Sequence, residues 1–274
     1  MGHHNLNNDH DIINFLQLGD GPALRGLVDD LINRYNAGAK DPMKGVACIP
    51  LDTEEQIAFE KQDGTYTLIG TGFGKNQRGS ASQVIQCITE VLPMEDWDSA
   101  LKYAETPSLQ WLFTDMSGSA AISPKGDVLA QPKSFPGWIG AFLYARYQSG
   151  LHGVTIISCE NIPSNGELLQ AAVLSVVHEW KLDERFIHWL ETENRFISSR
   201  VIRDSRVMRL EKEEENNTPQ FAIVAEGFYR WWIQTDFLPT WLEELRRQTG
   251  RITPVSTWRR LYRSPTKKQT HIST

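Results

Sequence analysis

The amino-acid sequence predicts an α/β protein built on a doubly wound, mostly parallel sheet. Short apolar runs of strand length alternate with amphipathic helical segments over residues 11–196, a pattern typical of a parallel sheet with helices on both faces. One such run, at 154–158, leads into a polar loop and then into a long helix. At 274 residues and 40% hydrophobic, the chain can bury one large core.

The first predicted unit is a strand, a turn and a helix. Residues 11–18 (DIINFLQL) form the strand, and Gly19-Asp20-Gly21 forms the turn. Pro22 suits the first turn of a helix because the N–H that proline lacks would have no partner there. The apolar positions of the helix share one face; they are Leu24, Leu27, Val28, Leu31 and Ile32.

The later elements are predicted in the same way, from apolar runs of strand length and from amphipathic helical segments. Strands are predicted at 46–51, 65–70 and 109–114, and helices at 97–105 and 138–147. Beyond Arg195 the alternation weakens, and residues 221–233 form an aromatic, strand-like stretch. We expect the four strands at 12–18, 46–51, 109–114 and 154–158 to be parallel members of one sheet.

The loop after the strand at 154–158 carries Cys159, Asn161, Asn165 and Gly166. Open α/β sheets bind ligands at the carboxyl ends of their strands. Asn161 and Asn165 can donate and accept hydrogen bonds without carrying charge, which suits a bound carbonyl or an amide-bearing cofactor. Cys159 has no cationic neighbour in sequence to lower its pKa, and we interpret it as a small buried side chain.

Gly19 and Gly21 are also the first two glycines of a dinucleotide-binding fingerprint. The third would fall near Leu24, so the pattern is incomplete, and a simple turn is the other interpretation. Arg25 could add a charge-assisted contact to a phosphate. Asp52 closes the second strand, where a carboxylate can bind an adenosine ribose, or it caps a helix that begins at Thr53.

Composition excludes several classes of protein. The three cysteines lack CxxC spacing, and His3, His4 and His10 fit a disordered polar tail better than a metal site. No apolar run is long enough to span a bilayer, so we expect a cytoplasmic protein without a membrane partner. The net charge of −6 combines +8 after Glu244 with −14 elsewhere. We interpret that basic end as poorly folded rather than as a nucleic-acid site.

Longer segments resemble the polyol-specific long-chain dehydrogenases, the mannitol dehydrogenase family. The resemblance runs from about Ile13 to Ile233, and within the family it is strongest to members that interconvert a keto-sugar acid and its alcohol in hexuronate breakdown. The segments that carry it are LGDGPALRGLVDDLIN, QDGTYT, ISCENIPSNGELL and HEWKLDERFIHWLETENRF.

The resemblance implies a Rossmann-type domain that binds NAD and transfers hydride between a ketone and a secondary alcohol of a sugar acid or polyol. Gly19, Gly21 and Arg25 would then hold the pyrophosphate, and Asp52 the adenosine ribose. Asn161 and Asn165 would lie beside the nicotinamide and the reacting carbonyl, where an N–H can stabilise developing alkoxide charge.

The chain also departs from the family. The catalytic lysine motif of the family, K-x4-N-x2-H, belongs to a helical C-terminal domain, and no such pattern occurs here, even at Lys267 and Lys268. Ile202 stands where an aspartate is expected, and Gly118 where an acidic residue is expected. We therefore predict a truncated enzyme, with a disordered tail at 1–10, an NAD-binding domain at 11–237 and a non-family remnant at 238–274.

The sequence is consistent with two candidate functions. The first is an NAD-dependent oxidoreductase domain of hexuronate or polyol metabolism. The second is a non-catalytic NAD-binding or interaction module that kept the fold and lost the reaction. The missing lysine motif favours the second for this polypeptide, and the cofactor-side segments favour the first for its lineage. The sequence predicts no particular oligomeric state.

Overall fold

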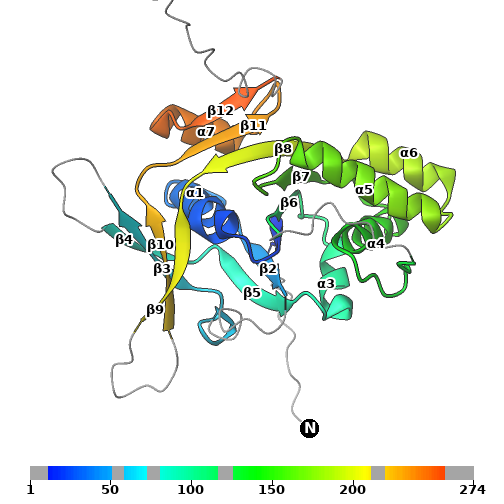
Figure 1. The fold of residues 1–274 in the computed structure, drawn as a ribbon, viewed down its shortest axis with the longest axis horizontal. Helices are drawn as coiled ribbons and strands as arrows, with labels where there is room; N and C mark the ends of the chain where they lie inside the picture. Colours follow the sequence, from blue (N-terminus) through cyan, green and yellow to red (C-terminus); the bar gives the residue numbers. More distant parts are fainter. Residues whose placement is uncertain (1–11, 51–58, 73–80, 117–125, 211–219, 257–274) are drawn as a thin grey trace, which may run out of the picture.

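A mostly parallel sheet forms the centre of the molecule (Figure 1). The computed structural model describes residues 12–50, 59–72, 81–116, 126–210 and 220–256. Within them, the main sheet has the strand order β12-β11-β8-β7-β6-β1-β2-β5. Its strands are β1 (Phe15–Leu18), β2 (Gly45–Ile49), β5 (Ile88–Pro93), β6 (Trp111–Thr114), β7 (Thr155–Ser158), β8 (Arg195–Ile202), β11 (Arg230–Gln234) and β12 (Ile252–Val255).

The four strands that the sequence predicted to be parallel are neighbours in the order β2-β1-β6-β7, and all their pairings are parallel. The predicted α/β fold class is therefore confirmed. β11 pairs antiparallel with β8 and parallel with β12. β1 lies where the strand order reverses, with β2 on one side and β6 on the other. Such a reversal leaves a crevice at the carboxyl edge of an α/β sheet.

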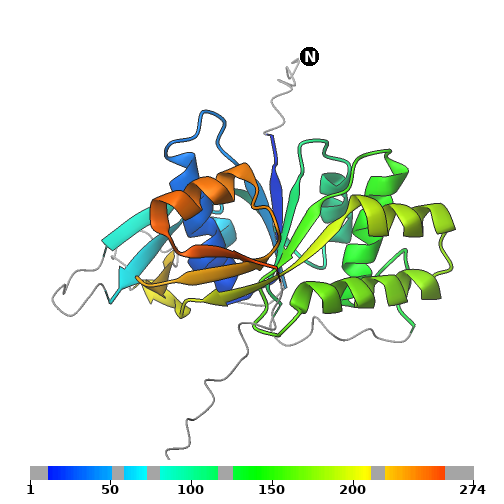
Figure 2. The same cartoon turned by 90° about the horizontal axis from the view of Figure 1, so that it is seen from above.

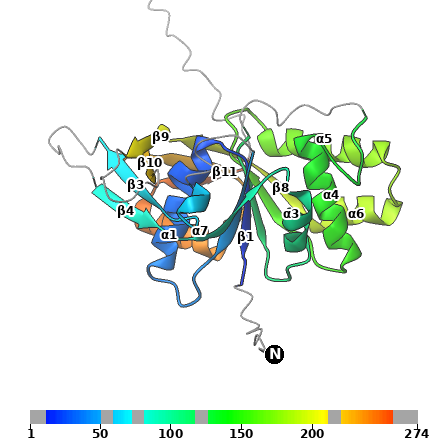
Figure 3. The same ribbon diagram turned by 90° about the horizontal axis from the view of Figure 1, so that it is seen from below.

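Successive side chains of β1 point to opposite faces of the sheet and pack in two different hydrophobic cores. Leu16 and Leu18 pack with α4 and α5, while Phe15 packs with the helix that follows β1. Figures 2 and 3 show the two groups of elements on opposite sides of the sheet. One side carries α3 (Trp97–Ala104), α4 (Phe135–Gln148), α5 (Asn165–Glu179) and α6 (Glu184–Glu193).

The other side carries η1 (Leu24–Val28), α1 (Asp29–Asn36), α7 (Thr240–Thr249) and a second sheet. The second sheet has the order β4-β3-β10-β9. Its strands are β3 (Tyr66–Thr71), β4 (Ala81–Ile85), β9 (Ser205–Leu210) and β10 (Gln220–Glu226). The aromatic stretch at 221–233 is thus two strands, β10 and β11, that belong to different sheets.

The prediction that the basic end after Glu244 is poorly folded is wrong for residues 245–255. α7 buries Trp241, Leu242 and Leu245 in the same core as Phe15 and Phe113. β12 then continues the main sheet. The positive charge at this end misled the sequence interpretation, because Arg246 and Arg247 lie on the outer side of an amphipathic helix and bind Glu243.

Candidate functional site

Two glycines bring the end of β1 against the end of β6. The N–H of Gly21 donates to the carbonyl oxygen of Asp115 at 2.7 Å, and the N–H of Gly19 donates to that of Cys48 at 2.9 Å. A Cβ atom at Gly19 would lie 2.4 Å from the Asp115 carbonyl oxygen. At Gly21 it would lie 2.0 Å from the Asp115 carboxyl carbon. Larger residues do not fit at these two positions. The glycines therefore let the chain turn tightly at the carboxyl edge of the sheet and enter the helical segment that includes η1.

The carboxylate of Asp115, the residue after β6, lies at the start of the helical segment that η1 and α1 form. Its Oδ2 accepts a hydrogen bond from the N–H of Ala23 at 2.8 Å. Burial raises the pKa of Asp115 to about 7, against the opposing effect of the Ala23 hydrogen bond, and the charges of Glu160 and Asp20 raise it further. Our sequence interpretation missed Asp115, although a carboxylate directly after a buried strand was the signal that identified Asp52.

Arg25 lies on η1 with its side chain inside the protein. The residue is 4% exposed, and its guanidinium carbon lies 5.4 Å from the centre of the Phe59 ring. Its charge acts on both Asp29 and Asp115. Its Nε and Nη2 atoms have no hydrogen-bond partner in the described part of the chain. Buried donors without partners are costly, and a guanidinium is well suited to bind phosphate.

The loop after β7 presents one acid and two asparagines that differ in exposure. Glu160 is buried, and its Oε1 accepts a hydrogen bond from the N–H of Met116 at 3.4 Å. Burial raises the pKa of Glu160, although hydrogen bonds from its own loop and from the end of β6 oppose the shift. Asn161 is exposed, whereas Asn165 is buried at the start of α5. The two asparagines that the sequence grouped together therefore occupy different environments.

The Asn165 side chain is fully engaged with the backbone. Its Nδ2 donates to the carbonyl oxygens of Ser158, Glu160 and Ser199 at 2.7–3.0 Å. Its Oδ1 accepts from the N–H groups of Gly166 and Ser199 at 2.9 and 3.0 Å. These contacts join β7, the loop, α5 and β8. An amide used in this way fixes the loop that carries Asn161 and has no donor left for a ligand.

The remaining predicted residues are placed as follows. Asp52 and Gly118 lie outside the described residues. Ile202 ends β8 and is 42% exposed. Cys159 is buried as predicted, and burial raises the pKa of its thiol well above the usual value, so the thiol is neutral. In the described part of the chain, no group of three His, Cys, Asp or Glu side chains is placed to hold a metal.

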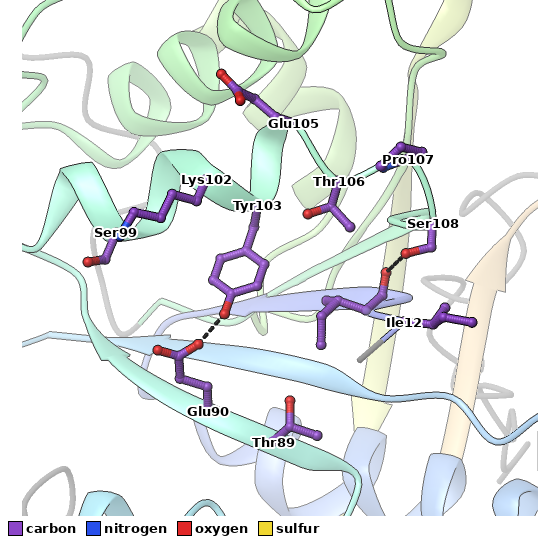
Figure 4. A pocket seen from close by; sticks show the side chains of 11 residues that line it. Ile12, Thr89, Glu90, Ser99, Lys102, Tyr103, Glu105, Thr106, Pro107 and Ser108 are labelled. Atoms are coloured by element: carbon purple, nitrogen blue, oxygen red, sulfur yellow. Dashed lines mark hydrogen bonds between the residues drawn. The ribbon is translucent and has the colours of Figure 1, made fainter. Parts of the chain in front are cut away.

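A cavity of about 790 Å³ lies at the opposite edge of the sheet. Its lining residues Ile13 and Ser108 precede β1 and β6, and Lys102 lies near the end of α3. Figure 4 shows Tyr103 donating a hydrogen bond to Glu90, and Ser108 donating one to the Ile13 carbonyl oxygen. Because this is the amino edge of the strands, the cavity is separate from the glycine turn and from the loop after β7.

A parallel sheet whose first strand leads through a two-glycine turn into a helix, at the reversal of strand order, defines a Rossmann-type domain. The mannitol dehydrogenase Rossmann domain family matches residues 13–243. The chain therefore belongs to the mannitol dehydrogenase family. Within the described residues, no helix has the length and apolar composition that crossing a bilayer requires.

Two relatives in sequence are altronate oxidoreductases. That of Bacillus subtilis (strain 168) is 30% identical over 240 residues, which cover 83% of this chain and 49% of that protein. That of Klebsiella pneumoniae (strain 342) is 33% identical over 239 residues, which cover 80% of this chain and 48% of that protein. The chain thus spans about half the length of these relatives.

Solved structures share the fold at lower sequence identity. The Pseudomonas fluorescens mannitol 2-dehydrogenase, in a ternary complex with NAD and D-mannitol, superposes with a TM-score of 0.68 and 19% identity over 90% of this chain and 53% of that one. A substrate-free D-sorbitol dehydrogenase superposes with a TM-score of 0.68 and 17% identity, over 90% of this chain and 55% of that one.

Proposed function

We propose that this chain is the NAD-binding half of an oxidoreductase that interconverts a tagaturonate-like keto-sugar acid and its altronate-like alcohol by hydride transfer. The observation that carries the proposal is the turn from Gly19 to Gly21, which places the start of a helix at the strand-order reversal of a member of this family. Backbone N–H groups at such a helix start attract phosphate. The altronate oxidoreductase relatives favour a sugar acid as the substrate.

The buried residues at this edge fit a dinucleotide. Arg25, which follows the turn on η1, has buried N–H groups without partners in the described part of the chain, as an anionic ligand requires. In the proposal Gly19, Gly21 and Arg25 hold the pyrophosphate, and Asp52 binds the adenosine ribose. NAD supplies the hydride acceptor when bound. Asn161, which is exposed at the carboxyl edge, is the amide of the loop that remains available to the substrate oxygen.

The structure changes the role that we propose for Asn165. Because all of its amide contacts go to backbone groups, we now propose it as a positioning residue for the loop rather than as a second donor to the carbonyl. Asn161 alone keeps the proposed role of stabilising negative charge on the reacting oxygen.

Titration calorimetry with NADH and NADPH tests the cofactor assignment. We expect NADH to bind more tightly, because the Asp52 carboxylate would repel a 2′-phosphate. The Asp52→Ser variant should lose most of that preference and bind NADH more weakly, because the carboxylate contact to the ribose is lost. Equal binding of both cofactors by the unmodified chain would contradict the assignment. Gly21 is a poor probe, because any side chain there collides with Asp115.

The second candidate is a module that binds NAD without catalysing a reaction. The specific observation in its favour is the absence from this sequence of K-x4-N-x2-H. Both candidates predict cofactor binding, so calorimetry does not separate them. Turnover of a sugar acid by this polypeptide would favour the first, and binding without turnover would favour the second.

A further inference from the structure

The Asp115 carboxylate occupies the groups that the proposed function assigns to the pyrophosphate. Its Oδ2 accepts from the N–H of Ala23, which belongs to the start of the helical segment. Its carboxyl atoms also cover Gly21, where a Cβ atom would lie 2.2 Å from Oδ2. The surface of Gly21 and the N–H group of Ala23 are therefore already in contact with an acidic group of the protein itself.

Most of the ionisable groups around this carboxyl are acids. Asp20 faces it from the turn, Glu160 and Cys159 from the end of β7, and Arg25 from η1. Arg25 is the cation in this group, and the Cys159 thiol is neutral. Near neutral pH, Asp115 is present in both ionisation states, because burial raises its pKa to about 7. Glu160 is held towards its neutral form for the same reason.

We propose that the ionised Asp115 carboxylate competes with the cofactor pyrophosphate for the start of the helix, so that the chain takes up a proton when it binds the cofactor. This inference rests on the proposed function. Two anions cannot share the Ala23 N–H group, beside the further acids Asp20 and Glu160, without strong repulsion. A protonated Asp115 removes one of the two charges, and its O–H can donate a hydrogen bond to a phosphate oxygen.

The sign of the pH dependence follows from this competition. Binding favours the protonated form, so affinity is highest below the pKa of Asp115 and falls as the pH rises through it. If only the protonated form binds, affinity falls about tenfold for each pH unit above 7. Between pH 6 and pH 8.5 the dissociation constant should then rise by about 30-fold, and proton uptake should approach about one per site at pH 8.5.

Calorimetry with ADP-ribose and NADH tests the inference. Each is titrated from pH 6 to pH 8.5 in two buffers with different ionisation enthalpies, because the difference in heat gives the number of protons taken up. ADP-ribose contains the pyrophosphate and has no phosphate group that titrates in this range. Adenosine, which lacks the pyrophosphate, serves as the ligand control, and its binding should be independent of pH.

Asp115→Asn is the decisive variant. Its Oδ1 can still accept from the N–H of Ala23, but it carries no charge and does not titrate. We expect pH-independent binding of ADP-ribose, no proton uptake, and tighter binding than the unmodified chain at pH 8.5. Glu160→Gln is the matched control, since it neutralises a neighbouring buried acid, and it should keep both the slope and the proton uptake.

Each result decides the question. A wild-type slope and proton uptake that persist in Asp115→Asn, or that vanish only in Glu160→Gln, would overturn the inference. Binding by the unmodified chain that is independent of pH, without proton uptake, would overturn it and leave the proposed function intact. An absence of NADH and ADP-ribose binding at every pH would overturn the proposed function itself. If Asp115→Asn does not fold, Glu160→Gln provides the test: proton uptake retained in this variant supports the inference, and uptake lost in it overturns the inference.

Discussion

The Asn165 side chain forms hydrogen bonds with five buried backbone groups. Two of them, the Ser158 carbonyl and the Gly166 N–H, also bond to a serine hydroxyl. Truncation to alanine leaves three carbonyl groups and two N–H groups without those bonds. Buried polar groups that lose their partners cost about 1–3 kcal/mol each, partly recovered by relaxation and water. We expect Asn165→Ala to lower the free energy of unfolding by about 3 kcal/mol, measured by urea denaturation followed by tryptophan fluorescence.

Asn161→Ala is the matched control in the same loop. Asn161 is exposed, so its removal should change the free energy of unfolding by less than about 0.5 kcal/mol. Equal destabilisation by the two substitutions would contradict the structural role of Asn165. The contrast also shows the limit of the sequence interpretation, since two asparagines in one polar loop looked equivalent until the contacts of each were known.

The buried carboxyl group of Asp29 should make the stability of the protein depend on pH. It is fully buried, and burial raises its pKa from 3.8 to about 6, against hydrogen bonds from Gln17 and Tyr66 that lower it. Because the folded-state pKa is the higher one, protonation of Asp29 favours the folded state. This contribution to the free energy of unfolding is complete below about pH 4 and is lost as the pH rises through 6. The loss amounts to about 3 kcal/mol.

Asp29→Asn should therefore unfold with a free energy that changes less between pH 4 and pH 7 than that of the unmodified chain. The amide can accept from Gln17 and donate to the Tyr66 hydroxyl oxygen, so the contacts of the site are retained. Urea denaturation at pH 4, 5, 6 and 7 measures the difference. Parallel pH profiles for the two proteins would contradict the prediction.

At the scale of elements, Arg146 ties α4 to the segment between α3 and β6. Its guanidinium donates to the carbonyl oxygens of Ala104, Thr106 and Leu109 at 2.9–3.1 Å, and to that of His152 at 2.6 Å. Arg146→Met retains apolar volume but removes all four bonds. We expect a loss of about 3 kcal/mol in the free energy of unfolding, measured in urea.

Arg185→Met, on the exposed face of α6, is the control for Arg146. It removes the same charge but no buried hydrogen bond, so its effect should stay below about 0.5 kcal/mol. Equal stability of the two variants would show that the four carbonyl groups find other partners.

Elements that repeat a simple period were predictable from the sequence. The strands β1, β2, β6 and β7 are short apolar runs, and each bound lies within a few residues of the expected one. The second sheet was not predicted as a sheet, because β10 pairs with β3 across more than 150 residues. α7 was missed because its arginines suggested a basic tail, although Trp241, Leu242 and Leu245 already carry the helical period.

The candidate site was predictable only in part. Gly19 and Gly21 form the turn that their spacing indicated, and Arg25 follows it on η1 with its guanidinium over the Phe59 ring. Asp115 was not foreseen, because its contact with Ala23 spans 92 residues and depends on β6 lying next to β1. Spacing along the chain reveals a turn, whereas the group that covers the turn depends on the order of strands in the sheet.

At the scale of the whole molecule, the polypeptide of 274 residues corresponds to about half of its altronate oxidoreductase relatives. Reduction of a ketone needs a proton donor at the developing alkoxide, and this sequence has no K-x4-N-x2-H motif to provide it. The described lysines 102 and 181 do not replace it. Lys102 lines the cavity at the amino edge of the sheet, and Lys181 follows the end of α5.

We therefore expect this polypeptide to bind NADH without turning over tagaturonate or fructose, and to bind NAD without oxidising altronate or mannitol. A steady-state assay of NADH absorbance measures this, with a full-length altronate oxidoreductase as the positive control. Rates of about 1 per second or more, ordinary for enzymes, would contradict the prediction.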